Sequence, residues 1–319
     1  MAKRRMAVIA FFACFCIWLT PYYAMAASTS DASKPINIEK SCSLNLTYVC
    51  DEIAFKDVPV KLYKVASVSE DFQYTLTERF ASSNLILNGI KTNGEWNTIC
   101  STLEALIIAD NIEDDGAAIT DLNGETCFLS LSPGLYIVLS QTITQEGVTC
   151  FFDSALIALP GRGEDGIWQY DIEVASKSEI IPPSVNDIEL KVIKLWKGDE
   201  GKNNRPKNVE VQIFRDGIIY KEIILSKENN WSYSWVVKDD GAKWTVIERN
   251  IPSDYTMTAE KREATFIVTN TYTPKNPGKP PQTGETFNVM LFVLIMIVSG
   301  SILTILGVIG KRKAYEETK

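Results

Sequence analysis

Three polar residues lie on otherwise apolar faces of strands predicted in the second half of the chain. In "DIELKVIKLWKGDEG", Lys194 is in phase with the apolar residues, because side chains along a strand alternate between two faces. Glu248 follows the same rule in "KWTVIERN", and Asn270 follows it in "ATFIVTNTY". An unpaired buried lysine or glutamate is costly and rare. We therefore expect the three side chains to meet and satisfy one another.

Such a trio has a specific chemistry. Burial lowers the pKa of a lysine and raises the pKa of a carboxyl group. A neutral Lys194 amine could then attack the side-chain carbonyl carbon of Asn270, while protonated Glu248 polarises that carbonyl and passes a proton to the departing ammonia. The product would be an intramolecular amide, formed once and without turnover. The alternation is equally compatible with a buried Lys194–Glu248 ion pair beside a hydrogen-bonded Asn270.

The strands that carry these residues belong to a predicted β unit over residues 187–273. The stretch "SKSEIIPPSVND" breaks the alternating pattern before this unit, and we assign residues 179–186 as an interdomain linker. After the unit, "TPKNPGKPP" is rich in Pro, Gly and Lys, which predicts an extended stalk over residues 274–280.

A first β region is predicted over residues 35–178, with strands in "CSLNLTYVC", "VPVKLYKVASV", "LNGETCFLSLSPGLYIVLS", "CFFDSALIALPG" and "GIWQYDIEVASK". In the first of these, one face carries Leu44, Leu46, Tyr48 and Cys50. The stretch "WNTICSTLEALIIADNI" instead has apolar residues at helical spacing, which predicts one inserted helix. Its expected core stripe consists of Trp96, Ile99, Leu103, Leu106 and Ile107.

Five cysteines remain once the N-terminal segment is set aside, and all lie in the first region. Export would permit disulfides among them, but an odd number leaves at least one without a partner in the chain. Buried free thiols are the alternative. The spacing assigns no pairs among the candidates Cys42, Cys50, Cys100, Cys127 and Cys150.

Both ends of the chain indicate export. "MAKRRMAVIAFFACFCIWLTPYYAMAAS" has a basic start, an apolar core and a small-x-small site, which predicts a secretory signal peptide over residues 1–26. An uncleaved anchor is the alternative. The apolar residues 287–310 would span about 36 Å as a transmembrane helix. The tail 311–319 begins Lys-Arg-Lys and would stay inside, which places the bulk of the chain outside the cytoplasm.

Composition argues against several functions. The formal net charge is −8, which disfavours nucleic acid as a partner. The chain has no histidine, so it lacks a Ser-His-Asp or Cys-His centre and the commonest metal ligand. We expect no cofactor, no metal site and no enzyme that turns over. A surface-held enzyme is the weakest alternative.

The second region resembles a known domain in several ordered motifs: "LKVIKLWKGDEGKNNRPKNVEVQIFRDG", "NNWSYSWVV", "WTVIERNIPSDYTM" and "TFIVTNTYTP". Together they are similar to the Cna B-type repeat domain, which implies an antiparallel, immunoglobulin-like sandwich of reversed topology. The family's crosslinking lysine precedes the strand-one Trp, matching Lys194. Its acid lies in Tyr-x-Val-x-Glu, matching Glu248 with Trp244 in place of Tyr, and its asparagine lies in Thr-Asn-Thr-Tyr, matching Asn270. The resemblance favours the amide crosslink over the ion pair.

The C-terminal residues 281–319 resemble a Gram-positive sortase sorting signal, whose usual motif is Leu-Pro-x-Thr-Gly. Pro280 replaces the leucine, and the matching residues are Pro281, Gln282, Thr283 and Gly284. The resemblance implies that a sortase cleaves between Thr283 and Gly284 and joins Thr283 to an amine of peptidoglycan or of a neighbouring pilin subunit. The membrane helix would be a temporary tether. A plain single-pass membrane protein is the alternative.

The stretch "WQYDIEVASK" resembles the pilin motif Trp-x-x-x-Val-x-Val-Tyr-Pro-Lys and would leave Lys177 exposed as an acceptor amine. Ala175 and Ser176 replace Tyr and Pro, and a solvated lysine before a linker is the slightly favoured alternative. The first region also resembles shaft domains of Gram-positive pilins in "VPVKLYKVA", "TDLNGETCFLSLSPGLYIV" and "ALIALPG". Its first strand has Thr47 and Tyr48 where a lysine is expected, so we predict no crosslink there. Disulfides could substitute.

These observations predict an all-β protein with two Ig-like, Cna B-type antiparallel sandwich domains in tandem, the first with an inserted helix, followed by a transmembrane sorting helix. The expected function is that of a cell-wall-anchored surface structural protein. The favoured form is a pilin subunit attached or polymerised by sortase and stiffened by a Lys–Asn isopeptide bond. The alternative is a monomeric wall-anchored adhesin that presents its N-terminal domain to a host or matrix ligand.

Overall fold

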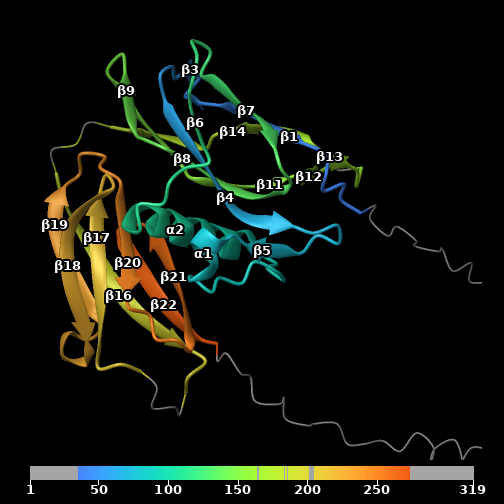
Figure 1. Cartoon of the computed structure of the whole chain (residues 1–319). Coiled ribbons are helices and arrows are strands. Elements are labelled where there is room, and N and C mark those ends of the chain that lie inside the picture. The colour runs from blue at the N-terminus through green and yellow to red at the C-terminus, as the bar shows by residue number, and fades with distance from the viewer. Residues whose placement is uncertain (1–34, 164, 183, 185, 201–204, 274–319) are drawn as a thin grey trace, which may run out of the picture.

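The computed structural model of the chain describes residues 35–163, 165–182, 184, 186–200 and 205–273 (Figure 1). The predicted signal peptide, the stalk and the sorting signal with its transmembrane helix lie outside these residues. In the part of the chain that is described, none of the helices has the length and apolar character needed to cross a bilayer.

The first region, blue through green to yellow-green in Figure 1, consists of short strands and two helices. The helices are α1 (Glu78–Ala81) and α2 (Asn93–Ala109). The strands are β1 (Cys42–Thr47), β2 (Val49–Cys50), β3 (Ile53–Ala54), β4 (Pro59–Val68), β5 (Tyr74–Leu76), β6 (Gly116–Ile119), β7 (Glu125–Leu131), β8 (Gly134–Ser140), β9 (Ile143–Gln145), β10 (Val148–Phe152), β11 (Ala155–Leu159), β12 (Gly161–Arg162), β13 (Trp168–Gln169), β14 (Asp171–Ala175) and β15 (Ser178–Ile181).

The largest sheet of this region has the order β11-β8-β4-β5, with β6 also paired to β4. A second sheet has the order β14-β1-β7, and a third has the order β15-β10-β9. The predicted apolar face of the first strand is confirmed, since Leu44, Leu46, Tyr48 and Cys50 are all buried in one apolar cluster. Alternation along this strand therefore identified its core side correctly.

Helix α2 begins three residues before the predicted apolar stripe because the preceding residues cap it. Thr92 Oγ1 accepts a hydrogen bond from Glu95 N at 3.2 Å, and Glu95 Oε2 accepts one from Thr92 N at 2.9 Å. This reciprocal capping box satisfies backbone donors that the first helical turn leaves free. The predicted stripe is confirmed for its four aliphatic members, which are buried, while Trp96 is only half-buried.

The second region, yellow to orange in Figure 1, is a two-sheet sandwich with the strand orders β19-β16-β22-β21 and β18-β17-β20. Side chains of both sheets share one apolar cluster. Its elements are β16 (Asp187–Lys197), β17 (Asn208–Arg215), β18 (Ile218–Ser226), the 3-10 helix η1 (Lys227–Asn229), β19 (Ser232–Lys238), β20 (Trp244–Arg249), β21 (Tyr255–Arg262) and β22 (Thr265–Tyr272).

Two strand pairs depart from the antiparallel expectation. Strand β1 pairs with β14 in parallel, and β16 pairs with β22 in parallel. In each case the pair joins an early strand of its region to a late one, so the two strands enter the sheet side by side in the same direction. The remaining pairs of the described sheets are antiparallel.

The predicted linker 179–186 was wrong at its start. Ser178–Ile181 forms β15, which pairs antiparallel with β10 so that Ile180 lies opposite Cys150. The Glu-Ile-Ile residues before Pro182 can extend and offer a full backbone ladder, whereas proline removes a donor and ends the pairing. The connection between the two regions is therefore shorter than expected.

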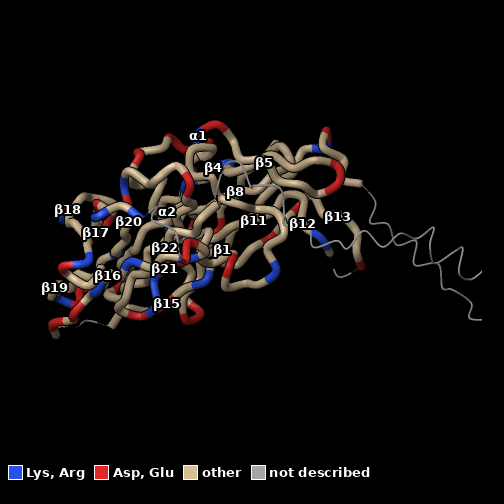
Figure 2. Tube along the Cα trace, turned by 90° about the horizontal axis from the view of Figure 1, so that it is seen from below, with Lys and Arg blue, Asp and Glu red and all other residues tan. Residues whose placement is uncertain are grey.

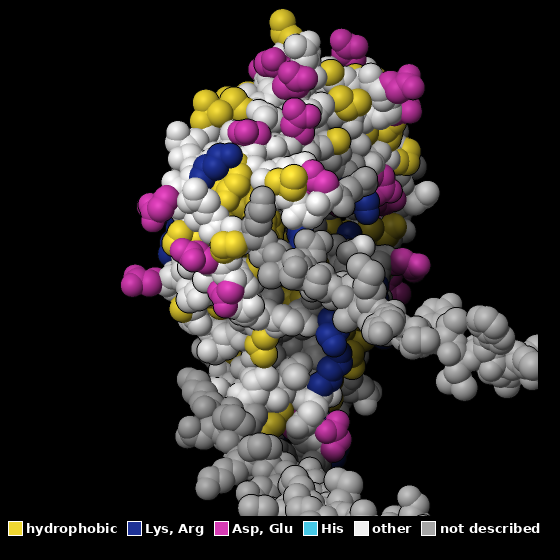
Figure 3. Space-filling model, turned by 90° about the vertical axis from the view of Figure 1, so that its right-hand side faces the viewer, with side chains coloured by type: hydrophobic (Ala, Val, Ile, Leu, Met, Phe, Trp, Pro, Cys, Tyr) yellow, Lys and Arg dark blue, Asp and Glu magenta, His cyan; other side chains and the backbone are white. Residues whose placement is uncertain are grey.

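The two regions contact each other through α2, which lies against β20 and β21 of the sandwich (Figure 1). The apolar cluster is continuous from the first region through α2 into the second. Charged positions are interspersed over both regions (Figure 2). On the face shown in Figure 3, the hydrophobic side chains of the described residues form small groups separated by polar and acidic ones.

Candidate functional site

The second region places Lys194, Glu248 and Asn270 in the interior of the sandwich, on two facing sheets. Lys194 lies on β16 and Asn270 on β22, and in the parallel register Lys194 is opposite Val268. The residue opposite Asn270 is Trp196, so Lys194 lies two positions earlier on β16. Glu248 lies on β20 of the other sheet, so it reaches the pair from across the core.

The Glu248 carboxyl group bridges the other two side chains. Lys194 Nζ lies 3.0 Å from Glu248 Oε2, and Asn270 Nδ2 donates a hydrogen bond of 2.8 Å to Glu248 Oε1. The side chains of Lys194 and Glu248 are 0% exposed, and so is Asn270. The trio that the sequence pattern predicted thus converges in a site without access to water.

Burial changes the proton affinities of the ionisable pair. It lowers the pKa of Lys194 to about 8, against the opposing attraction of the Glu248 carboxylate. Burial also raises the pKa of Glu248, against the opposing effects of Lys194 and of the Asn270 hydrogen bond. Both shifts favour transfer of a proton from the lysine to the glutamate. Both shifts thus act in the direction that nucleophilic attack by the amine would require.

One oxygen atom of the trio has no hydrogen-bond donor: Asn270 Oδ1 is buried and unsatisfied. Lys194 Nζ reaches Glu248 Oε2 at 3.0 Å and also donates to the carbonyl oxygens of Leu195 at 3.2 Å and Val268 at 3.5 Å. A buried acceptor without a donor is costly. A proton on Glu248 would supply one, and a half-turn of the Asn270 amide would bring its oxygen to that proton.

An aromatic and ionic cluster that the sequence reasoning missed covers the lysine. Lys194 Nζ lies 4.4 Å from the ring centre of Trp196, whose ring packs edge-on against Tyr255. Tyr255 OH donates a hydrogen bond of 2.8 Å to Asp199, and Arg205 contacts both oxygens of that carboxylate at 2.6 and 2.7 Å. Hydrogen bonding from Arg205 lowers the pKa of Asp199 to about 2. The one available signal was the pairing of opposite charges across "GDEGKNNRP".

The candidate cysteines separate into one pair and three free thiols. Cys50 on β2 and Cys150 on β10 form a disulfide across a sequence separation of 100. Cys42 and Cys100 are free and buried, and Cys127 is free and exposed. The disulfide closes a long loop, which contributes on the order of 4–5 kcal/mol through the unfolded state.

Lys177 is exposed and follows β14, as the alternation of "WQYDIEVASK" predicts. Its backbone carbonyl accepts a hydrogen bond of 2.9 Å from Asp153 N, which anchors the backbone beside an otherwise free side chain. The residue lies at a cleft of about 1040 Å³ between the two regions. The sorting-motif residues Pro281, Gln282, Thr283 and Gly284 lie outside the described residues.

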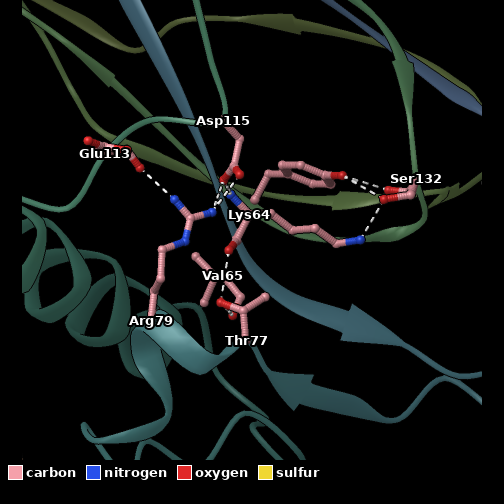
Figure 4. A network of polar contacts seen from close by, with 8 residues as sticks. Lys64, Val65, Thr77, Arg79, Glu113, Asp115 and Ser132 are labelled. Carbon is pink, nitrogen blue, oxygen red and sulfur yellow. Dashed lines mark hydrogen bonds and ion pairs between the residues drawn. The ribbon is translucent and has the colours of Figure 1, made fainter.

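The first region contains a half-buried lysine, Lys64, and among the described residues its amine contacts a hydroxyl group and a tyrosine ring. Lys64 Nζ donates a hydrogen bond of 2.5 Å to Ser132 Oγ, and its backbone N–H donates one of 2.6 Å to Asp115 (Figure 4). Asp115 also pairs with Arg79. Burial lowers the pKa of Lys64.

In the part of the chain that the structure covers, no group of three or more His, Cys, Asp or Glu residues could hold a metal ion.

One family model matches most of the second region. Residues 190–271 match the family model described as the Cna protein B-type domain. The collagen adhesin of Staphylococcus aureus is 30% identical over 125 residues, which is 37% of this chain and 11% of that protein. The chain thus spans about a tenth of that relative's length. The matched family segment contains all three residues of the trio.

Solved structures give weaker likenesses. A single B repeat unit of the collagen-binding surface protein Cna of Staphylococcus aureus is 17% identical, with a TM-score of 0.26 over 74% of this chain and 100% of that one. The full-length major pilin SpaD of Corynebacterium diphtheriae is 11% identical, with a TM-score of 0.27 over 76% and 99%. Scores this low do not assign a function.

Proposed function

We propose that this chain is a structural protein of a Gram-positive cell surface whose second region crosslinks itself through an amide between Lys194 Nζ and Asn270 Cγ. The observation that carries the proposal is the Glu248 carboxyl group, which contacts the amine at 3.0 Å and the amide at 2.8 Å inside a fully buried site. The match of residues 190–271 to the Cna B-type domain and the likeness to a collagen adhesin support the surface role.

The reaction begins with transfer of a proton from Lys194 to Glu248, which leaves a neutral amine and a carboxylic acid. The amine attacks Asn270 Cγ while the acid donates a hydrogen bond to Asn270 Oδ1 and stabilises the developing negative charge. Glu248 then carries the proton lost by the amine to Asn270 Nδ2. The Cγ–Nδ2 bond breaks, ammonia leaves, and one N–C bond replaces another, so no oxidant or cofactor is needed.

The position of the crosslink explains its use. Strands β16 and β22 are the first and last strands of the second region, and they run parallel as neighbours. An amide between them would carry tension directly from one end of the region to the other. It would also close a loop of about 77 residues, which by analogy with a disulfide contributes on the order of 4–5 kcal/mol through the unfolded state.

The crosslink is tested by the intact mass of the chain from residue 27 to residue 283, which keeps every described residue. The proposal predicts a protein lighter than its sequence by one ammonia, after correction for the Cys50–Cys150 disulfide. A mass that equals the sequence would leave only a buried ion pair and would remove the basis of the proposal.

Attachment is the second part of the proposal. A sortase would cleave between Thr283 and Gly284, and the exposed Lys177 amine would accept Thr283 of a neighbouring subunit. The chain would then be a pilin subunit, exported, held briefly in the membrane and finally bound to peptidoglycan. The named relative, a collagen adhesin, favours a second candidate: a monomeric wall-anchored adhesin with an unidentified host or matrix ligand.

Cell-wall extracts distinguish the two candidates. A pilin gives a ladder of high-mass species on boiled denaturing gels, and Lys177→Ala abolishes it while the matched surface variant Lys56→Ala does not. A single wall-released band in all three strains would exclude polymerisation and favour the adhesin. A ladder that persists in Lys177→Ala would show that another amine is the acceptor.

A further inference from the structure

Helix α2 of the first region closes one side of the second region's sandwich. It lies against β20 and β21, which are edge strands of the two facing sheets (Figure 1). An edge strand has a neighbour on one side only, so its backbone groups and its position are less constrained than those of a central strand. Glu248 is on β20, and the only strand that pairs with β20 in the described sheets is β17.

Ion pairs fix both ends of β20 to the helix. Lys243, the residue before the strand, pairs with Glu104 of α2, and both side chains are largely buried, at 18% and 11% exposed. Arg249, the last residue of the strand, pairs at 2.6 Å with Asp110, which caps the C-terminus of the helix. The six residues of β20 are therefore held between two contacts with one rigid element.

The helix also fills the outer side of β20. Ile247 points away from the sandwich interior, because it alternates with the inward-facing Glu248, yet it is 0% exposed. It belongs to the same apolar cluster as Leu103, Leu106 and Ile107 of α2. The strand that carries the acid is thus packed from both sides, although its own sheet ends there.

A buried threonine of α2 substitutes for a missing strand next to β21. Thr102 Oγ1 accepts a hydrogen bond of 2.9 Å from Ala259 N and lies 3.2 Å from Ala259 O. Thr102 is 0% exposed. One turn earlier, Thr98 Oγ1 donates to Glu260 Oε2 at 3.1 Å. A side-chain hydroxyl of the helix therefore satisfies one backbone N–H on the free edge of the sheet that contains β21.

From these contacts we propose that α2 positions the trio for the Lys194–Asn270 reaction. Glu104 holds β20, which carries Glu248, and Thr102 holds β21, which pairs with the Asn270 strand β22; both positioning residues lie outside the matched domain at 190–271. The inference depends on the proposed crosslink. Its physical basis is that the carboxyl group must contact an amine and an amide at once, and a displacement of about 1 Å is enough to slow such a reaction strongly. The helix removes the freedom that an edge strand would otherwise have.

The test measures the rate of ammonia loss. The chain from residue 27 to residue 283 is isolated in guanidinium chloride directly after a short cell-free synthesis, before it folds, and is then refolded by dilution under oxidising conditions. Samples are quenched in acid and weighed by mass spectrometry, while tryptophan fluorescence reports folding.

Two variants test the threonine: Thr102→Val keeps the shape and removes the hydroxyl, and Thr102→Ser keeps the hydroxyl. Two more test the ion pair: Glu104→Lys breaks it, and Glu104→Lys combined with Lys243→Glu restores it with the charges exchanged. Asp187→Asn removes an exposed ion pair with Lys238, between β16 and β19, and is the control.

The inference predicts that Thr102→Val and Glu104→Lys slow ammonia loss at least fivefold after folding is complete. Thr102→Ser and the charge-swapped double variant should stay within twofold of wild type, as should Asp187→Asn. Equal rates in all folded variants would overturn the inference and leave the crosslink intact. If the charge-swapped double variant and Thr102→Ser also lose ammonia slowly, or if Asp187→Asn is slowed to the same extent, α2 is only a general stabiliser of the fold. That outcome would also overturn the inference. A wild-type chain that never loses ammonia would refute the proposed crosslink, and the inference with it.

Discussion

Lys194 on β16 and Asn270 on β22 lie on neighbouring parallel strands, and both contact the carboxyl group of Glu248 from the opposite sheet. The lysine and the asparagine come from the two ends of the second region, and the acid comes from between them. This arrangement brings a nucleophile, an electrophile and a proton carrier together in a site that contains all the groups needed for one amide. The proposed amide would join the first and last strands of the region.

The rate of ammonia loss should depend on pH with a plateau. The reaction needs one proton on the Lys194–Glu248 pair, so it stops when both groups are deprotonated or both are protonated. Burial lowers the pKa of Lys194 to about 8 and raises the pKa of Glu248. Above pH 8 the rate should fall about tenfold per pH unit, and it should also fall below the pKa of Glu248. Refolding into buffers of different pH, with mass readout, measures this. A rate that keeps rising above pH 9 would contradict the proton count.

Loss of the crosslink should lower stability markedly. Asn270→Ala removes the electrophile, so the chain keeps an open loop and a buried Lys194–Glu248 pair. We expect the free energy of unfolding of the second region to fall by on the order of 4–5 kcal/mol or more. Guanidinium chloride unfolding, with mass spectrometry to confirm that no ammonia is lost, checks this. The exposed Asn208→Ala on β17 serves as control. Equal unfolding midpoints for Asn270→Ala and wild type would refute the stabilising role.

The disulfide should stabilise the first region independently of the amide. Cys50→Ser should lower the free energy of unfolding by about 4 kcal/mol, because the bond closes a loop of 100 residues. The exposed free thiol Cys127 provides the matched control, and Cys127→Ser should leave the midpoint unchanged. Calorimetry of both variants, under conditions that keep wild type oxidised, measures the difference. A shift of similar size in Cys127→Ser would mean that the effect is not due to the disulfide.

The local parts of the structure were predictable from the sequence. Alternation with a period of two identified the inward faces that carry Lys194, Glu248 and Asn270, because that period is a property of a single strand. It did not reveal that Glu248 lies on the facing sheet, since sheet membership depends on distant pairings. The same limit applies to Cys50 and Cys150, whose partnership is fixed by the fold across 100 residues.

Other features were missed for identifiable reasons. The start of α2 depends on the Thr92–Glu95 capping box, which precedes the apolar stripe that revealed the helix. Strand β15 lies in a stretch dominated by its following prolines, so it was assigned to the linker. The contacts of Thr102 and Glu104 with the second region have no local signal, because a polar residue on a helix ordinarily faces water.

Peptide mapping of the purified chain tests the central claim most directly. After digestion, tandem mass spectrometry should find one branched peptide in which Lys194 and Asn270 are joined and one ammonia is missing. The branched peptide should be present in wild type and in the exposed-face control Glu189→Gln, and absent from Glu248→Gln, which keeps the shape of the acid but cannot carry the proton. Separate linear peptides with unmodified Lys194 and Asn270 in the wild-type protein would contradict the account.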